Sequence, residues 1–144
     1  MNPDPLETAR QMWADDPASR ALGMELRDLG AGVAVVAMTV RADMVNGYAV
    51  AHGGLVAALA DSAFALACNS RGARTVAAGF DVTFLEPAHM GDLLVATADE
   101  RSRRGRSGLY DVTVRREDDV IAEFRGRSRA MAQIGGGGVA GSLA

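Results

Sequence analysis

One segment of this chain is apolar on every face of a helix. The segment from Gly54 to Cys68 is interrupted only by Asp61 and Ser62, and the polar residues 69–72 that follow it end in a glycine, which suits a helix C-terminus. A helix that is hydrophobic all round is stable only when other protein surrounds it. The pattern therefore predicts one buried central helix, which begins at His52-Gly53-Gly54.

Shorter stretches rich in branched apolar residues, with partial alternation, indicate strands on both sides of this helix. Two of them, residues 21–29 and 33–40, flank Gly30-Ala31-Gly32 and predict a hairpin. Four more follow the helix, at residues 75–85, 92–103, 107–116 and 120–131. A weak helical pattern over residues 6–14, which ends before Pro17, predicts a short N-terminal lid helix.

The order of these elements predicts an α+β fold. A strongly curved antiparallel sheet wrapped around the long central helix would cover every face of that helix. We expect residues 1–134 to form this single domain. Residues 135–144 are rich in glycine, so we expect a flexible tail there.

The composition narrows the possible functions. A chain of 144 residues with a net charge of -3 fits one soluble domain and does not favour binding to nucleic acid. All fifteen basic residues are arginines, which excludes a lysine Schiff base and a Walker phosphate loop. The apolar segment is shorter than the roughly 20 residues that cross a bilayer.

The few cysteines and histidines exclude further classes. Cys68 is the only cysteine, and His52 and His89 are the only histidines, so neither a disulfide framework nor a Cys/His zinc cluster can form, and no metal site is expected. The N-terminus lacks the features of a secretory signal. We therefore expect a cytoplasmic protein, in which Cys68 is a small core residue and His89 is an exposed turn residue.

Asp61 is the strongest single sign of chemistry. An isolated carboxylate on an apolar helix costs several kcal/mol of desolvation unless it is paired or used. It is either a catalytic group or a carboxylate satisfied by backbone amides or by an arginine of a neighbouring strand.

The glycines at the predicted helix start are a second sign. Gly53 and Gly54 would let a ligand approach free backbone N–H groups at the positive end of the helix dipole, where an oxyanion binds well; the alternative is a simple turn. Gly53 and Asp61 are eight residues apart, which is about 12 Å along one helix. They can act on one carbonyl only if two subunits share the site, so this reading predicts a two-fold dimer.

The motifs around the helix closely resemble those of the hotdog-fold thioesterases of phenylacetic acid degradation, the PaaI family. The motifs are Asn46-Gly47, His52-Gly53-Gly54, Leu59 to Ala65 and Ala67-Cys68-Asn69-Ser70, and the likeness extends to Ala34 to Val40, Asp81 to Pro87, Gly91-Asp92, Tyr110-Asp111 and Phe124-Arg125-Gly126. The resemblance implies a hotdog fold, dimers paired into a homotetramer, and a hydrolase that needs no cofactor. The implied substrate is an aryl-acyl-CoA, either phenylacetyl-CoA or its ring-hydroxylated form, split to free acid and coenzyme A.

The same resemblance assigns roles to four residues. Asp61 becomes the nucleophile or the general base, and the Gly53 N–H polarises the thioester carbonyl. Asn46 and His52 position the substrate or the hydrolytic water. The alternatives are that His52 ties the preceding loop to backbone and that Asn46 is only the turn residue of Asn46-Gly47.

A basic hairpin is the candidate for binding the coenzyme A phosphates. Guanidinium and backbone donors lie together in Arg104-Gly105-Arg106-Ser107, and the family binds the nucleotide end of coenzyme A at the surface. The alternative is a solvated basic turn.

Two other functions remain possible on this fold. A hydroxyacyl thioester dehydratase would need a histidine base with a carboxylic acid, but His52 and Asp61 do not have that family's spacing. A noncatalytic acyl-CoA sensor would bind its ligand without turnover. Release of free thiol, abolished by Asp61→Asn, would separate the thioesterase from both.

Overall fold

The computed structural model describes residues 3–132, so the predicted tail at 135–144 lies outside the described residues. The elements are α1 (Glu7–Ala14), α2 (Pro17–Ala21), β1 (Glu25–Gly30), β2 (Val33–Thr39), the 3-10 turn η1 (Ala42–Met44), α3 (Gly53–Cys68), β3 (Thr75–Phe84), β4 (Leu93–Arg104), β5 (Ser107–Arg116) and β6 (Asp119–Ala130). The predicted order of a hairpin, one long helix and four strands is confirmed.

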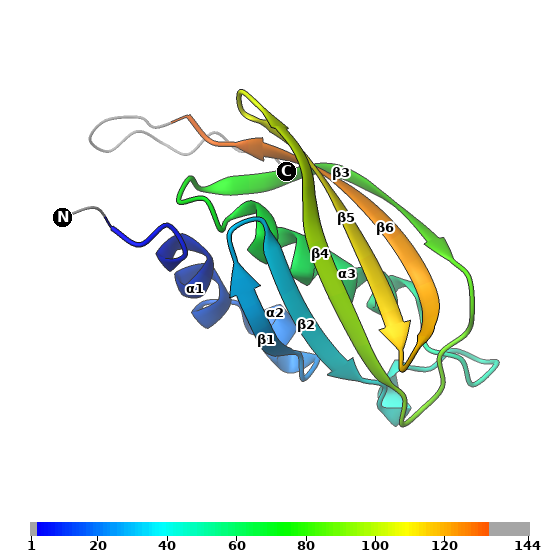
Figure 1. Cartoon of the computed structure of the whole chain (residues 1–144). Coiled ribbons are helices and arrows are strands. Elements are labelled where there is room, and N and C mark those ends of the chain that lie inside the picture. The colour runs from blue at the N-terminus through cyan, green and yellow to red at the C-terminus, as the bar shows by residue number, and fades with distance from the viewer. Residues whose placement is uncertain (1–2, 133–144) are drawn as a thin grey trace.

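The strands form one six-stranded sheet in the order β1-β2-β4-β5-β6-β3. Every neighbouring pair is antiparallel. The sheet curves around α3, which lies behind it in Figure 1. The sheet does not close, so β1 and β3 are its two edges.

The core lies between α3 and the concave face of the sheet. The side chain of Phe64 is fully buried, with its ring centroid 5.6 Å from that of Tyr110 and 5.7 Å from that of Phe124. A Cβ at Gly126 on β6 would lie 2.7 Å from the Phe64 ring. The close approach of helix and sheet therefore depends on glycine at position 126.

The sheet covers α3 less completely than the sequence predicts. Gly54 is exposed, and Ala58, Asp61 and Ala65 are only half-buried. The reason is that the sheet is open and α1 and α2 contact α3 over a limited area. One face of the apolar helix is thus incompletely covered within a single chain.

The first strand also begins later than predicted. Residues 17–21 form the short helix α2, and β1 starts only at Glu25. Asp16 caps α2 by accepting a hydrogen bond from the Ser19 N–H at 3.0 Å, and Pro17 occupies the first helical position, which proline favours. Asp16-Pro17 therefore ends one helix and begins the next.

Candidate active site

The start of α3 presents two free backbone amides. Leu55 N–H and Val56 N–H donate to His52 O at 2.9 and 3.2 Å, whereas the N–H groups of Gly53 and Gly54 have no acceptor among residues 3–132. The His52 side chain is exposed and does not cap the helix. Such amides, at the positive end of the helix dipole, are suited to binding an oxyanion.

Asn46 organises the loop that leads to these amides. Its Oδ1 accepts hydrogen bonds from Tyr48 N–H at 2.9 Å and Val50 N–H at 3.2 Å, and its own N–H donates to Val50 O at 2.7 Å. These bonds fit the turn role weighed from the sequence. Because Oδ1 already accepts two hydrogen bonds, Asn46 would contact substrate through its Nδ2 group. That contact stays a prediction.

Asp61 projects from the middle of α3 and is half-buried. Its carboxylate has no hydrogen bond or ion pair within the described part of the chain, although the chain has fifteen arginines. Burial, and secondarily the negative charge of Asp16, raises the pKa of this carboxyl group above its ordinary value. Within a single chain, Asp61 therefore has neither the arginine nor the backbone amide partners that a purely structural carboxylate would have. Its raised pKa means that it holds a proton more strongly than an ordinary carboxyl group does.

Gly53 and Asp61 lie on the same helix. Eight residues of α-helix separate them by about 12 Å, so one chain does not bring the free amide and the carboxylate to the same carbonyl group. A site shared between two subunits stays a prediction.

A cleft of about 350 Å³ opens beside the start of α3. Its wall is largely apolar and includes Asn46, Gly53, Val56, Phe84, Leu85 and Ile121. A Cβ at residue 53 would lie 3.0 Å from the Phe84 ring, so glycine allows this ring to sit close to the amide. The sequence alone does not identify Phe84, because this contact joins the end of β3 to the start of α3.

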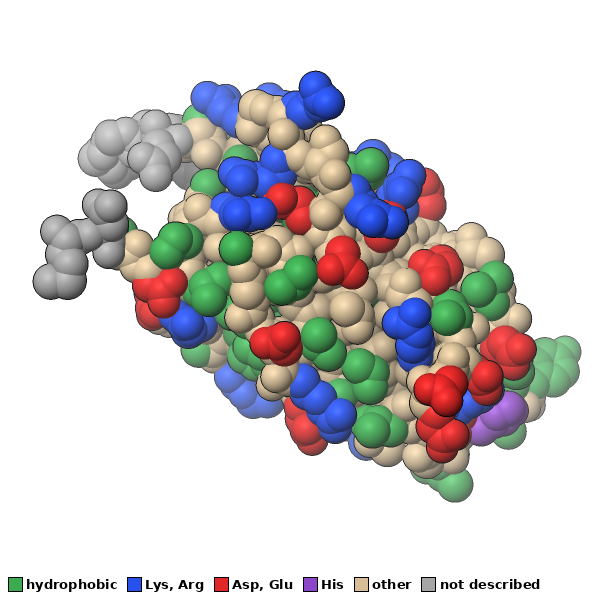
Figure 2. Space-filling view, in the orientation of Figure 1, with side chains coloured by type: hydrophobic (Ala, Val, Ile, Leu, Met, Phe, Trp, Pro, Cys, Tyr) green, Lys and Arg blue, Asp and Glu red, His purple; other side chains and the backbone are tan. Residues whose placement is uncertain are grey.

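The candidate phosphate-binding hairpin lies at the far end of the molecule. Arg104 and Ser107 face each other across the β4–β5 turn, and Gly105 has a φ of 60°. Figure 1 shows this turn at the opposite end from the loop before α3, and Figure 2 shows arginines gathered over it. A single chain therefore brings residues 104–107 next to the C-terminal end of α3 and away from Gly53.

Arg104 and Arg106 form no ion pair with another described residue, whereas Arg103 lies 3.7 Å from Glu100. Two guanidinium groups of the turn are thus available to an anionic ligand, whose binding stays a prediction.

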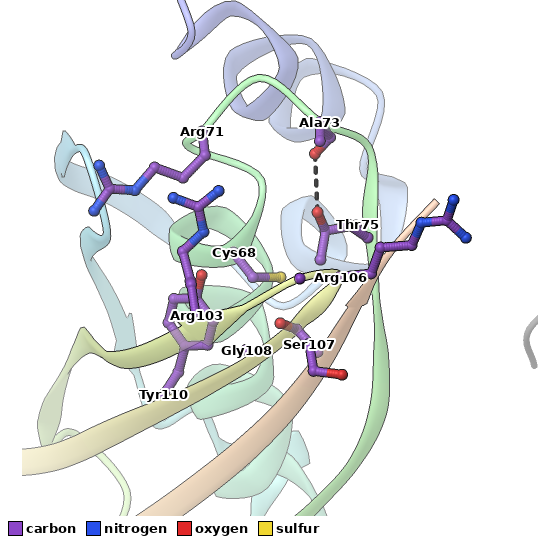
Figure 3. A pocket seen from close by; sticks show the side chains of 12 residues that line it. Cys68, Arg71, Ala73, Thr75, Arg103, Arg106, Ser107, Gly108 and Tyr110 are labelled. Atoms are coloured by element: carbon purple, nitrogen blue, oxygen red, sulfur yellow. Dashed lines mark hydrogen bonds between the residues drawn. The ribbon is translucent and has the colours of Figure 1, made fainter. Parts of the chain in front are cut away.

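A small pocket of about 30 Å³ separates this turn from Cys68. Figure 3 shows the Cys68 sulfur directed toward the pocket, with Arg103 and Tyr110 on one side and Ser107 on the other. Cys68 is buried, and desolvation, with the charge of Asp61, raises the pKa of its thiol to about 12. Cys68 belongs to the buried hydrophobic core, so the prediction that it is a core residue is confirmed.

The described residues offer no other centre of chemistry of the expected kinds. His89 is exposed, as predicted. Residues 3–132 contain no group of three or more His, Cys, Asp or Glu side chains placed to hold a metal ion. Within that range, no helix is both long enough and apolar enough to span a membrane.

Comparison with known proteins agrees with the sequence motifs. Residues 48–123 match the model of the thioesterase superfamily. The chain is 42% identical over 131 residues to the acyl-coenzyme A thioesterase PaaI of Escherichia coli, with 90% of this chain and 91% of that protein covered.

Solved structures are also similar. The E. coli PaaI protein from the phenylacetic acid degradation operon superposes with a TM-score of 0.86 at 39% identity, covering 90% of this chain and 94% of that one. A mutant of the phenylacetic acid degradation protein PaaI from Thermus thermophilus gives a TM-score of 0.78 at 41% identity, covering 80% and 99%.

Proposed function

Because this chain belongs to the thioesterase superfamily, within the PaaI family of hotdog-fold thioesterases, we propose that it hydrolyses aryl-acyl-CoA in phenylacetic acid catabolism. The chain is a thioester hydrolase. The proposed substrate is phenylacetyl-CoA or ring-hydroxylated phenylacetyl-CoA, and the products are the free acid and coenzyme A. The observation that carries the proposal is the unpaired, half-buried Asp61 on a helix whose first two amides are free.

The chemistry assigned to these groups is acyl transfer to water. As the thioester carbonyl becomes tetrahedral, its oxygen gains negative charge, which the Gly53 N–H stabilises without reorganisation. Asp61 supplies the attack, either by taking a proton from water or by adding directly to form a mixed anhydride that water then splits. In both routes the C–S bond breaks, the thiolate leaves and becomes protonated, and one water is consumed.

The proposed active unit is a dimer, paired further into a tetramer. Gly53 and Asp61 of one chain are about 12 Å apart. They can act on the same carbonyl group if Gly53 of one subunit faces Asp61 of a second. Strand β3 has a free edge, and Phe80 and Phe84 on it are 40% and 51% exposed. A second copy that covers this edge would bury these rings and the uncovered face of α3.

The remaining assignments complete the proposal. His52 and Asn46 orient the substrate or the water at the start of α3. The turn Arg104-Gly105-Arg106-Ser107 binds phosphates of coenzyme A, and the two arginines without an ion pair support this assignment. We place the enzyme in the cytoplasm and assign it no cofactor.

A thiol-release assay tests the proposed function. Phenylacetyl-CoA, a hydroxyphenylacetyl-CoA, acetyl-CoA and a long-chain acyl-CoA are compared, and we expect the highest kcat/KM for the aryl substrates. Asp61→Asn should lower kcat at least ~100-fold, whereas Asp28→Asn, which removes an exposed carboxylate on β1, should leave it unchanged. Full turnover by Asp61→Asn would refute the role of Asp61, and tight binding of every substrate without thiol release would favour a sensor.

A further inference from the structure

Three polar side chains link helix α2 to helix α3 in one hydrogen-bond chain. The Oγ atoms of Ser62 and Ser19 are 2.8 Å apart, and Ser19 Oγ lies 2.6 Å from Asp16 Oδ2. Because Ser19 donates its single hydroxyl proton to the carboxylate, Ser62 must donate to Ser19. Ser19 is 3% exposed, whereas Asp16 and Ser62 are half-buried, so the chain is buried at its centre and ends at the residue that follows Asp61.

Capping alone does not account for this arrangement. The cap of α2 needs only the bond from Ser19 N–H to Asp16 Oδ1, at 3.0 Å. The second carboxylate oxygen extends the connection through two hydroxyl groups into α3. A charge-assisted O–H···O bond of this length is strong and directional, so the Asp16 carboxylate is held in place relative to Ser62, the neighbour of Asp61 on α3.

Asp16 is the charged group that this hydrogen-bond chain brings near Asp61, through Ser62. Neither carboxylate has an ion pair with any residue from 3 to 132, and Arg20 of α2 instead donates to Ala14 O at 2.7 Å. Burial, and then the charge of Asp16, raises the pKa of Asp61, and Cys68, farther along α3, stays protonated at neutral pH. Two carboxylates therefore lie on packed helices, and neither has an ion pair with a described cation.

We propose that Asp16, Ser19 and Ser62 are positioning residues of the hydrolase, which hold the Asp16 charge near Asp61 and so move the acid limit of its activity to higher pH. The proposal rests on the role of Asp61 in the proposed function. A nearby negative charge disfavours ionisation of a carboxyl group and makes its carboxylate a stronger base. Through Asp16, helix α2 would thereby raise the pKa of the attacking carboxyl group on α3.

The test is the pH dependence of kcat/KM for phenylacetyl-CoA, measured by thiol release. Asp16→Asn keeps a good helix cap and removes the charge, so the acid limb of the profile should move to lower pH. Asp16→Glu keeps the charge and should hold the limb close to its wild-type position. Asp28→Asn, which removes an exposed carboxylate of β1 outside this hydrogen-bond chain, should leave the profile unchanged.

Three results would overturn the proposal: an unmoved acid limb in Asp16→Asn, an equal shift in Asp16→Glu, or an equal shift in Asp28→Asn. If Asp16→Asn does not fold, Ser62→Ala cuts the same chain at its other end and has good helix propensity. Its acid limb should move in the same direction by a smaller amount, and an unmoved limb would again reject the proposal. Full activity of Asp61→Asn would refute the proposed function itself. If Asp61→Asn is inactive but the acid limb of Asp16→Asn does not move, only the effect of Asp16 on Asp61 is refuted.

Discussion

Asp61 is the residue on which the proposed chemistry depends, and its surroundings are unfavourable for a structural carboxylate. Other acidic residues of this chain form ion pairs with arginines, as Glu100 does with Arg71 at 2.8 Å. Asp61 is half-buried and has no such partner within residues 3–132. Retaining a carboxylate there costs stability, which fits a group used for reaction and not for folding.

The sequence identifies Asp61 for a simple physical reason, because one charge on an otherwise apolar helix stands out. It cannot reveal that Asp16 is linked to Ser62, the residue that follows Asp61, since that link depends on how α2 packs against α3. Nor can it show that the Asn46 oxygen is occupied by two backbone amides. Both facts depend on three-dimensional arrangement and leave no periodic signal.

The amide of Gly53 can be tested with a matched pair of substitutions. Gly53→Pro removes the N–H at the first helical position, where proline is favoured, and the backbone of His52 (φ -59°, ψ 127°) is compatible with a following proline. Gly53→Ala adds a similar Cβ near Phe84 but keeps the N–H. We expect Gly53→Pro to lower kcat by about 10²–10³-fold, the usual effect of losing one oxyanion donor, and Gly53→Ala to lower it much less.

The readout is kcat for phenylacetyl-CoA, with thermal unfolding as the control for folding. Equal losses in the two folded variants would show that the space beside Phe84, and not the amide proton, limits activity.

At the scale of elements, the hydrophobic pattern identifies the long helix and all six strands. It misses α2, because five residues that follow Asp16-Pro17 are too few to show helical periodicity. It also leaves the strand order open. The placement of β3 beside β6, with Phe84 paired with Ala122, is decided by long-range packing and not by local propensity.

The three strands β4, β5 and β6 are joined on their exposed face by Asp111. Its carboxylate accepts from Arg101 Nε at 2.7 Å and from Arg125 Nε and Nη2 at 2.7 and 2.9 Å. Hydrogen bonds from Arg125, and then from Arg101, hold the pKa of Asp111 at about 2. Because this pKa is below the unfolded value near 3.9, the pair stabilises the fold above about pH 4 and loses this effect as the pH falls toward 2.

Asp111→Asn should therefore lower the free energy of unfolding by about 1 kcal/mol at pH 7, since the arginines are half-exposed. The difference from wild type should shrink between about pH 4 and pH 2. Urea unfolding at several pH values measures it, and Asp118→Asn in the exposed β5–β6 turn serves as the control. A difference that does not depend on pH would mean that lost packing, and not the ion pairs, is responsible.

At the scale of the whole molecule, one chain holds the parts of the proposed hydrolytic site without bringing them together. The free amides mark one end of α3, the carboxylate its middle, and the basic turn lies beyond its other end (Figure 1). The uncovered face of α3 and the free edge of β3 are surfaces that a second copy can cover. The proposed site, built from two subunits, would account for all of these features.

Subunit mixing tests this explanation directly. Gly53→Pro and Asp61→Asn should each be inactive alone, yet a site that takes Gly53 from an Asp61→Asn subunit and Asp61 from a Gly53→Pro subunit is intact. With equal co-expression and random assembly, about one site in four meets this condition, so the mixture should recover about a quarter of wild-type kcat. Co-expression of two differently tagged Asp61→Asn chains is the control and should recover nothing. If each site were built from a single chain, every site in the mixture would carry one substitution, and the activity would stay at the level of the inactive parents.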